Sequence, residues 1–92
     1  MQGKDIRARV RDRMITQMPL GTISLIEVLD NHRVLIENHK GIAAYGCNEI
    51  RVRVHDGYNC IMGSRLELNR ISNEKVVIEG NVECIRFCRG KE

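Results

Sequence analysis

The chain changes character at Gly21, and this change restricts the fold more than any other feature of the sequence. Beyond it, apolar runs of about five to seven residues, rich in β-branched side chains, alternate with Gly, Asn and Asp. Runs this short leave no room for a long helix. The predicted strands are Thr22–Leu29, Arg33–Asn38, Ile42–Tyr45, Glu49–Val54, Tyr58–Met62, Arg65–Ile71 and Lys75–Phe87, the last broken or bent near Gly80. We therefore expect an all-β fold, mainly an antiparallel sheet or roll of short strands.

The sequence VHDGY marks the best-defined hairpin. A three-residue loop, His55 to Gly57, places Gly57 where a G1 bulge needs a left-handed residue and gives the hairpin one apolar face. The pairs that it predicts are Val54 with Tyr58, Val52 with Cys60 and Ile50 with Met62. A two-residue loop of Asp56 and Gly57 mixes polar and apolar residues on each face, so we favour the longer loop. The outward side chains are then those of Arg51, Arg53 and Asn59, and neither arginine has an aromatic neighbour.

Two polar clusters are predicted to turn the chain between strands. Asp30, Asn31 and His32 form the first, because Asp and Asn bond their own backbone and tolerate tight geometry. The second cluster is Asn38, His39, Lys40 and Gly41. Its residues either turn the chain or contact a partner, and we favour the turn because the fold requires only that role.

The N-terminal part carries the net charge of the chain. Lys4, Arg7, Arg9, Arg11 and Arg13 stand against Asp5 and Asp12, five minus two, which equals the formal net charge of +3 of the whole chain. Residues 4–18 are read as a short helix with Ile6, Val10 and Met14 on one stripe, or else as a frayed basic arm. Pro19 ends this segment. The expected organisation is thus an arm or short helix over residues 1–18 and a single β domain over residues 19–92.

The residues predict no reaction chemistry. His39 and Cys47 are the nearest approach to a nucleophile and base, but no third group to orient the histidine is evident, so we expect no enzyme. Cys84 and Cys88 are four apart on a strand, about 13 Å, too far for one ion, so we expect no metal and no cofactor. Without an apolar run long enough for a membrane span or export signal, the chain is expected in the cytoplasm with reduced cysteines.

Binding to a partner is the remaining class of function. Ninety-two residues bury a marginal core, which favours self-association into a homo-oligomer. Nucleic acid is the less favoured partner and would bind through the basic arm and the Arg51 and Arg53 face. A small-molecule substrate is not expected, because so short a chain with three aromatic residues offers little material for an enclosing pocket.

The residues alone do not indicate a function, but a resemblance to a known family does. The stretch LIENHKGIAAY, followed by EIRVRVHDGYNCIMGSRLELNRISNEKVVIEGNVECIRF, resembles the YabP/YqfC family of sporulation proteins, in particular its YqfC branch. The family pattern I-E-N-H-[KR]-G matches Ile36 to Gly41, and the pattern's I-E-G step and apolar ending match Ile78 to Phe87. The likeness covers about residues 18–87.

The resemblance implies a non-enzymatic protein of spore envelope assembly, made in the mother cell of Gram-positive spore formers. It also implies a protein partner, because YqfC relatives tend to be encoded beside YqfD, a membrane protein. The expected function is therefore that of a small adaptor or self-assembling β module, working with a YqfD-like membrane protein at the membrane around the forespore.

Overall fold

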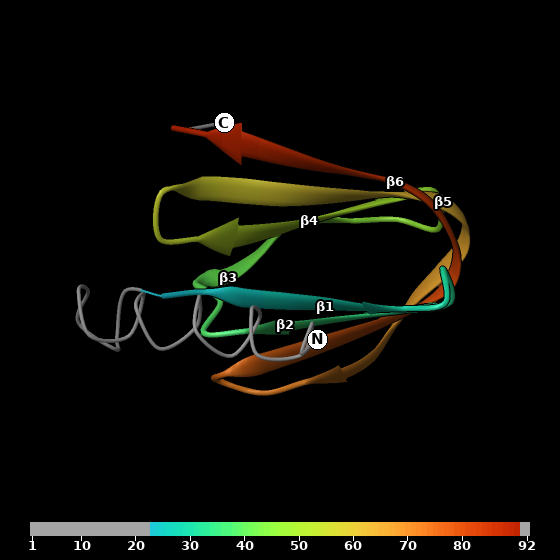
Figure 1. The fold of residues 1–92 in the computed structure, drawn as a ribbon, viewed down its shortest axis with the longest axis horizontal. Helices are drawn as coiled ribbons and strands as arrows, with labels where there is room; N and C mark the ends of the chain where they lie inside the picture. The colour runs from blue at the N-terminus through green and yellow to red at the C-terminus, as the bar shows by residue number, and fades with distance from the viewer. Residues whose placement is uncertain (1–22, 91–92) are drawn as a thin grey trace, which may run out of the picture.

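The computed structural model describes residues 23–90, which form one six-stranded antiparallel sheet with the strand order β1-β2-β6-β5-β4-β3 (Figure 1). Its strands are β1 (Leu25–Leu29), β2 (Arg33–Glu37), β3 (Gly41–Tyr45), β4 (Glu49–Val54), β5 (Gly57–Ile71) and β6 (Lys75–Arg89). The described residues contain no helix, and the predicted all-β class is confirmed. The predicted N-terminal helix or arm lies outside the described residues.

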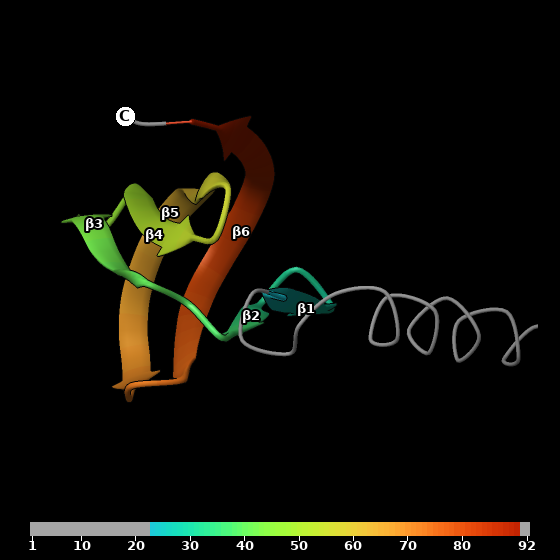
Figure 2. The ribbon, with the colours of Figure 1, turned by 90° about the vertical axis from the view of Figure 1, so that its left-hand side faces the viewer.

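The long strands β5 and β6 make this sheet curl on itself. Figures 1 and 2 show both strands bending sharply about half-way along, so that β1 and β2 line one half of the curl and β3 and β4 line the other. The bend falls at Gly63 and Gly80, where a Cβ would collide with the carbonyl oxygens of Asn81 and Arg65, respectively. Only glycine permits so close a backbone approach.

This bend corrects one prediction. Tyr58–Met62 and Arg65–Ile71 were expected to be separate strands, but β5 runs without a break from Gly57 to Ile71 and instead shifts register at bulges, one of them between Met62 and Gly63. A bulge lets a strand change direction while it stays paired, so a glycine in an apolar run need not end a strand. The break or bend predicted near Gly80 is a bend, because β6 runs as one strand from Lys75 to Arg89 and curves together with β5 (Figure 1).

The core lies between the two halves of the curl. Its fully buried members are Val34, Ile36, Ile50, Val52, Ile61, Leu66, Val76 and Ile78. These side chains come from β2, β4, β5 and β6, the strands inside the sheet, because an inner strand is covered by neighbours on both sides. We call the side of the sheet that carries them the core face.

The predicted turn at residues 30–32 is confirmed. Asp30 and Asn31 both adopt positive φ, 54° and 63°, and the His32 amide donates to the Leu29 carbonyl at 3.0 Å. Two successive left-handed residues define a type I′ turn, whose twist matches that of a hairpin. The turn also meets the bend of β6, since the Gly80 and Val82 amides donate to the carbonyls of His32 and Asn31.

The predicted register of the β4–β5 hairpin is wrong. Val54 pairs with Gly57, Val52 with Asn59 and Ile50 with Ile61, so the loop holds two residues, His55 and Asp56. Gly57 is needed for another reason: a Cβ there would collide with the carbonyl oxygen of Cys88 on β6. The close contact with β6 fixes the position of Gly57, and the position of the β4–β5 loop follows from that.

The shift of register exchanges the faces of β5. Asn59 is 7% exposed and buried with the core residues, whereas it was predicted to point outward; Arg53 is exposed as predicted and Arg51 is half-buried. No buried side-chain nitrogen or oxygen in the described part of the chain lacks a hydrogen-bond partner. The core face therefore includes the buried side-chain amide of Asn59. The requirement for a purely apolar face led to the wrong register.

Candidate functional site

The corner between β2 and β3 contains the four residues singled out by the sequence, Asn38 to Gly41. Asn38 takes a positive φ of 63°, and its Nδ2 donates to the Ile23 carbonyl at 2.7 Å. The Ser24 hydroxyl donates to the Asn38 carbonyl at 2.9 Å. Asn38 therefore turns the chain and also ties it to the residues directly before β1.

His39 links this corner to the turn between β5 and β6. The Gly41 amide donates to His39 Nδ1 at 3.0 Å, so Nδ1 carries no proton. Nε2 is then the protonated nitrogen, and it donates to the Ser72 carbonyl at 2.7 Å. Both ring nitrogens are thus used in holding two loops together.

Backbone hydrogen bonds also hold this corner in place. The Asn38 amide donates to the Glu74 carbonyl at 2.6 Å, and the Lys40 amide donates to the Arg53 carbonyl at 2.7 Å. The corner bridges β2 and β3, which lie on opposite halves of the curl and are separated in the sheet by three strands. These bonds give the four residues a structural role; a contact of theirs with a partner stays a prediction.

A charged cluster lies on the face of β4 and β5 opposite to the core. Glu49 accepts hydrogen bonds from Arg51 Nε at 2.7 Å and from the Cys60 thiol at 2.9 Å. The Arg51 guanidinium lies over the ring of Tyr58, 5.7 Å from its centroid. The expectation that neither arginine has an aromatic neighbour is therefore wrong, and the reason is the corrected hairpin register, which pairs Arg53 with Tyr58.

The cluster shifts the pKa values of its members. Burial, then the hydrogen bond and negative charge of Glu49, raise the pKa of Cys60 to about 11. The hydrogen bonds from Cys60 and Arg51 lower the pKa of Glu49. The hydrogen bond and charge of Glu49 raise the pKa of Arg51. At neutral pH the cluster therefore holds a protonated thiol and a closed ion pair, the opposite of an activated nucleophile.

The sequence did not reveal Glu49, Arg51 and Cys60 as a group. Their proximity depends on the pairing of Arg51 with Cys60, which the predicted register excluded. The signal available in the sequence was the two-residue spacing of Glu49 and Arg51, which places both on one face of a strand.

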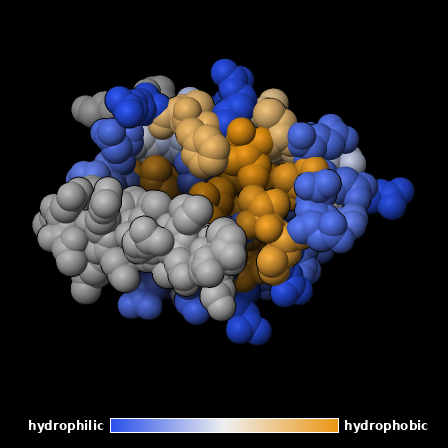
Figure 3. Space-filling view, in the orientation of Figure 1, coloured by the Kyte–Doolittle hydropathy of each residue, from blue (hydrophilic) through white to orange (hydrophobic). Residues whose placement is uncertain are grey.

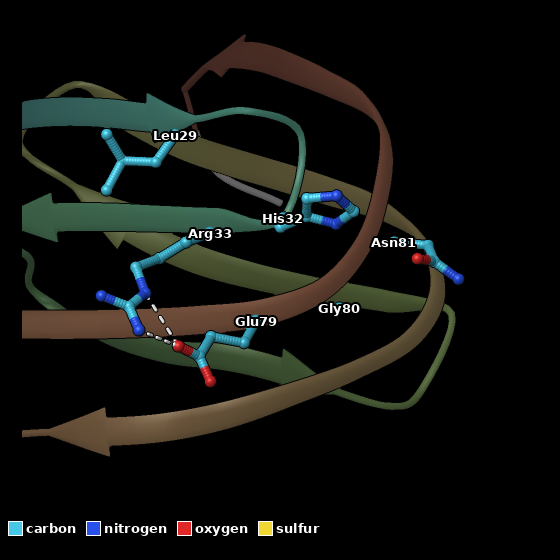
Figure 4. A pocket seen from close by; sticks show the side chains of 6 residues that line it. All are labelled: Leu29, His32, Arg33, Glu79, Gly80 and Asn81. Carbon is cyan, nitrogen blue, oxygen red and sulfur yellow. Dashed lines mark hydrogen bonds and ion pairs between the residues drawn. The ribbon is translucent and has the colours of Figure 1, made fainter.

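A shallow hollow lies at the bend of β6, lined by Leu29, His32, Arg33, Glu79, Gly80 and Asn81 (Figure 4). Arg33 Nε donates to Glu79 Oε2 at 2.7 Å, and the Nη2 of the same guanidinium also contacts this oxygen. Figure 4 shows Asn81 beyond the bend, with His32 between it and this ion pair. The charges of the hollow neutralise each other, so it has no charge preference for a ligand.

His39 and Cys47, considered above as a nucleophile and base, have other partners in the structure. The exposed Cys47 thiol donates to Asn48 Oδ1 at 3.0 Å, whereas His39 contacts Ser72 and Gly41. All four cysteines are free thiols. Within residues 23–90, no group of three or more His, Cys, Asp or Glu side chains is placed to hold a metal ion. The same part of the chain contains no helix with the length and hydropathy of a membrane span.

The strands at the two edges of the sheet, β1 and β3, each have one neighbouring strand. The edge strand β3 has the sequence GIAAY, without charge or proline, and Tyr45 at its end is 61% exposed. β1 carries the exposed Glu27 at its centre. Charge on an edge strand hinders pairing with another strand, so β3 is the more receptive edge.

Apolar side chains are also exposed on one side of the curl. Figure 3 shows them gathered on the face that Figure 1 presents, where β1 and the C-terminal half of β6 border the opening of the curl. The four rim residues are Ile26 and Val28 of β1 and Ile85 and Phe87 of β6; they pair with Ile36, Val34, Ile61 and Asn59, and therefore lie on the core face. Val28 is 46% and Phe87 is 69% exposed. We call this set the apolar rim.

The predicted electrostatic arm, Lys4, Arg7, Arg9, Arg11 and Arg13, lies outside the described residues. Among residues 23–90, nine Lys and Arg stand against nine Asp and Glu. The sheet is therefore close to neutral, and the sequence alone assigns the excess of positive charge to the arm.

A single curled sheet with a bonded corner, an ion-paired outer cluster and an open edge defines a small all-β protein. Comparison with known proteins gives its family: a model of the YabP family matches residues 21–92, and the chain belongs to that family. It is 27% identical over 62 residues to the uncharacterised protein YqfC of Bacillus subtilis (strain 168), a match that covers 67% of each chain. No solved structure matches the chain. The predicted YabP/YqfC membership is thus confirmed, and it is consistent with a sporulation-associated protein.

Proposed function

We propose that this protein is a non-enzymatic adaptor of spore envelope assembly, which acts in the mother cell by binding a membrane protein. The observation that carries the proposal is the uncharged edge of β3, together with membership of the YabP family. An exposed strand edge binds an extended segment of a partner through main-chain hydrogen bonds. An adaptor needs such a surface and needs no reactive group.

The bulge of β3 sets the strength of this binding. The ladder with β4 shifts register between Ile42 and Ala44, so the free edge is regular only over short stretches. A partner strand gains few main-chain bonds there, and its affinity is expected to be modest, as in transient complexes. Tyr45, beside this edge, provides an exposed ring that a partner can cover.

The partner proposed is a YqfD-like membrane protein at the membrane around the forespore. The basic arm over residues 1–18 supports this location, because each basic residue near an anionic leaflet contributes about 1 kcal/mol. The arm and the β domain of residues 19–92 then have separate tasks: the arm holds the protein near the membrane, and the edge of β3 recognises the partner.

A capture experiment from sporulating cells tests this function. Tagged full-length protein, cross-linked in the cells, should recover a membrane protein from the mother-cell fraction, and Tyr45→Lys should reduce that recovery several-fold. Leu29→Lys is the matched control: Leu29 is 52% exposed at the other edge, and its substitution should leave recovery unchanged. Equal recovery by all three proteins, or no membrane protein at all, would count against the adaptor.

One observation favours nucleic acid as a second candidate. The Arg51 guanidinium over the Tyr58 ring forms a small flat surface of the kind on which bases stack. Arg51 is already paired with Glu49, however, and the described residues bear no net charge, so this candidate depends on the basic arm. Tight, salt-sensitive retention of single-stranded RNA in a filter assay would favour it over the adaptor.

A further inference from the structure

The C-terminal half of β6 has a free edge, although β6 lies inside the strand order. β2 pairs with β6 only along residues 75–79, whereas β5 pairs with it nearly from end to end. The turn between β1 and β2 covers the next stretch, because the amides of Gly80 and Val82 donate to carbonyls of that turn. Within residues 23–90, the edge of β6 beyond Val82 therefore has no neighbouring strand.

The backbone groups on this free edge belong to Ile85, Phe87 and Arg89. The Gly90 amide donates to the Asp56 carbonyl in the β4–β5 loop at 3.1 Å, so the even-numbered amides here point toward β5. Successive residues of an antiparallel strand direct their N–H and C=O groups to opposite sides. The odd-numbered residues therefore present their groups to the free edge, as a row with which another strand can pair.

The apolar rim adjoins this row. Phe87 is 69% exposed and Ile85 is partly buried, and both side chains stand on the core face beside the free backbone groups. Figure 1 shows β1, which carries the other two rim residues, diverging from this half of β6 beyond the β1–β2 turn. A free strand edge with large apolar side chains beside it is a surface that suits strand addition.

We propose that a second copy of the chain occupies this surface, with the C-terminal halves of the two β6 strands paired antiparallel about a two-fold axis at Phe87. The regular edge extends from Cys84 to Gly90, because the register with β5 skips Glu83 and the described chain ends at Gly90. Phe87 is the centre of this stretch. An axis there pairs its whole length, with about six main-chain hydrogen bonds, and the sheet continues through both copies.

The side chains are compatible with this register. On the core face, Phe87 lies beside Phe87 of the second copy, and Ile85 lies beside the aliphatic stem of Arg89. On the outer face, Arg86 stands opposite Cys88, so no like charges meet. A register with Arg86 on the axis would set two guanidinium groups against each other, which is unfavourable. The register centred on Phe87 avoids this contact and pairs the most residues.

The size of the surface is that of a reversible contact. Phe87 and Val28 expose 69% and 46% of their surface, and with the strand edge each copy offers on the order of 400 to 600 Å². A stable complex buries about 800 Å² per partner, so this dimer should exchange with the monomer. The inference goes beyond the proposed function and does not depend on it, because it uses β6 and leaves the edge of β3 free.

Sedimentation velocity of the full-length protein tests the proposal. The sedimentation coefficient should rise from that of a monomer to that of a dimer as the protein concentration increases. Phe87→Lys places two like charges side by side at the axis and should raise the dimer dissociation constant about ten-fold or more. Ile71→Lys is the matched control: Ile71 is 52% exposed at the opposite end of the β5–β6 hairpin, and its substitution should leave the dimer unchanged.

Hydrogen exchange of the unsubstituted protein tests the pairing itself. The amides of Arg86 and Cys88 point toward β5 and should be protected at every concentration. The amides of Ile85, Phe87 and Arg89 should exchange rapidly in the monomer and become protected as the dimer forms. This measurement requires no substitution, so it also decides the case in which Phe87→Lys perturbs the fold.

Three results would overturn the proposal. The first is a protein that stays monomeric even at about 1 mM. The second is a dimer in which the amides of Ile85, Phe87 and Arg89 remain unprotected. The third is a dimer that Tyr45→Lys weakens and Phe87→Lys does not, because its contact would then lie at the edge of β3.

Discussion

Cys60 makes the stability of the protein depend on pH in the alkaline range. Its pKa is about 11 in the folded protein and close to 9 for an unperturbed thiol, so the folded state binds the proton more tightly. The stabilisation is complete below about pH 9 and is lost as the pH rises through 11. The free energy of unfolding should therefore fall between these pH values, by at most about 3 kcal/mol from this thiol.

Cys60→Ser isolates this effect, because a serine hydroxyl can also donate to Glu49 but does not ionise in this range. Urea unfolding of both proteins at several pH values between 8 and 11 gives the comparison. The parent should lose more stability than the variant as the pH rises. A constant difference between the two proteins across the range would mean that the thiol is not held protonated by its surroundings.

His39 is expected to stabilise the corner through both ring nitrogens. His39→Ala removes the bonds to the Ser72 carbonyl and the Gly41 amide and should lower the free energy of unfolding by about 1 to 3 kcal/mol. His55→Ala, in the exposed β4–β5 loop, is the matched control and should change stability by less than about 0.5 kcal/mol. Chemical denaturation at pH 8 measures both. Equal effects would remove the structural role assigned to His39.

Residue types predicted the turns well and the outer cluster not at all. Asp30, Asn31 and Asn38 adopt the positive φ values that such residues tolerate, so local chemistry was sufficient at these positions. The contact of Glu49 with Cys60 joins two strands, and its existence depends on register. A register that differs by one residue hides every such contact, because it exchanges the two faces of a strand.

The bend of the β5–β6 hairpin should depend on Gly63. Gly63→Ala would place a Cβ against the Asn81 carbonyl oxygen and should lower the free energy of unfolding by about 2 kcal/mol or more, through forced backbone movement. Gly46→Ala is the control: its Cβ would lie 3.6 Å from the Glu49 carbonyl oxygen, an ordinary contact. Thermal unfolding followed by circular dichroism compares the two. A bend that tolerates Gly63→Ala as well as Gly46→Ala would contradict this account of the curl.

Strands were easier to predict than their pairing. Glu49–Val54 was predicted with its observed bounds, since alternation and β-branched residues indicate a strand locally. The join of two predicted strands into β5, and the two-residue β4–β5 loop, depend on the passage of β6 beside Gly57 and Gly63. These glycines are explained by contacts with a strand distant in the sequence, which no local pattern shows.

The whole molecule is an open, curled sheet, and the sequence predicted its class without its strand order. The placement of β6 between β2 and β5 brings distant segments together, and short-range signals carry no information on such pairing. The order matters for function because it leaves β1 and β3 at the edges. Binding at the edge of β3 is the central claim about this molecule.

Direct binding to the proposed partner tests that claim. A YqfD-like membrane protein from the same cell, reconstituted in nanodiscs, should bind the labelled full-length protein more tightly than empty nanodiscs of the same lipids do. Tyr45→Lys should weaken this binding about ten-fold, the loss expected for a well-packed aromatic contact of about 1.4 kcal/mol, whereas Leu29→Lys should not. Equal binding to empty nanodiscs, or equal binding by the two variants, would contradict recognition through β3.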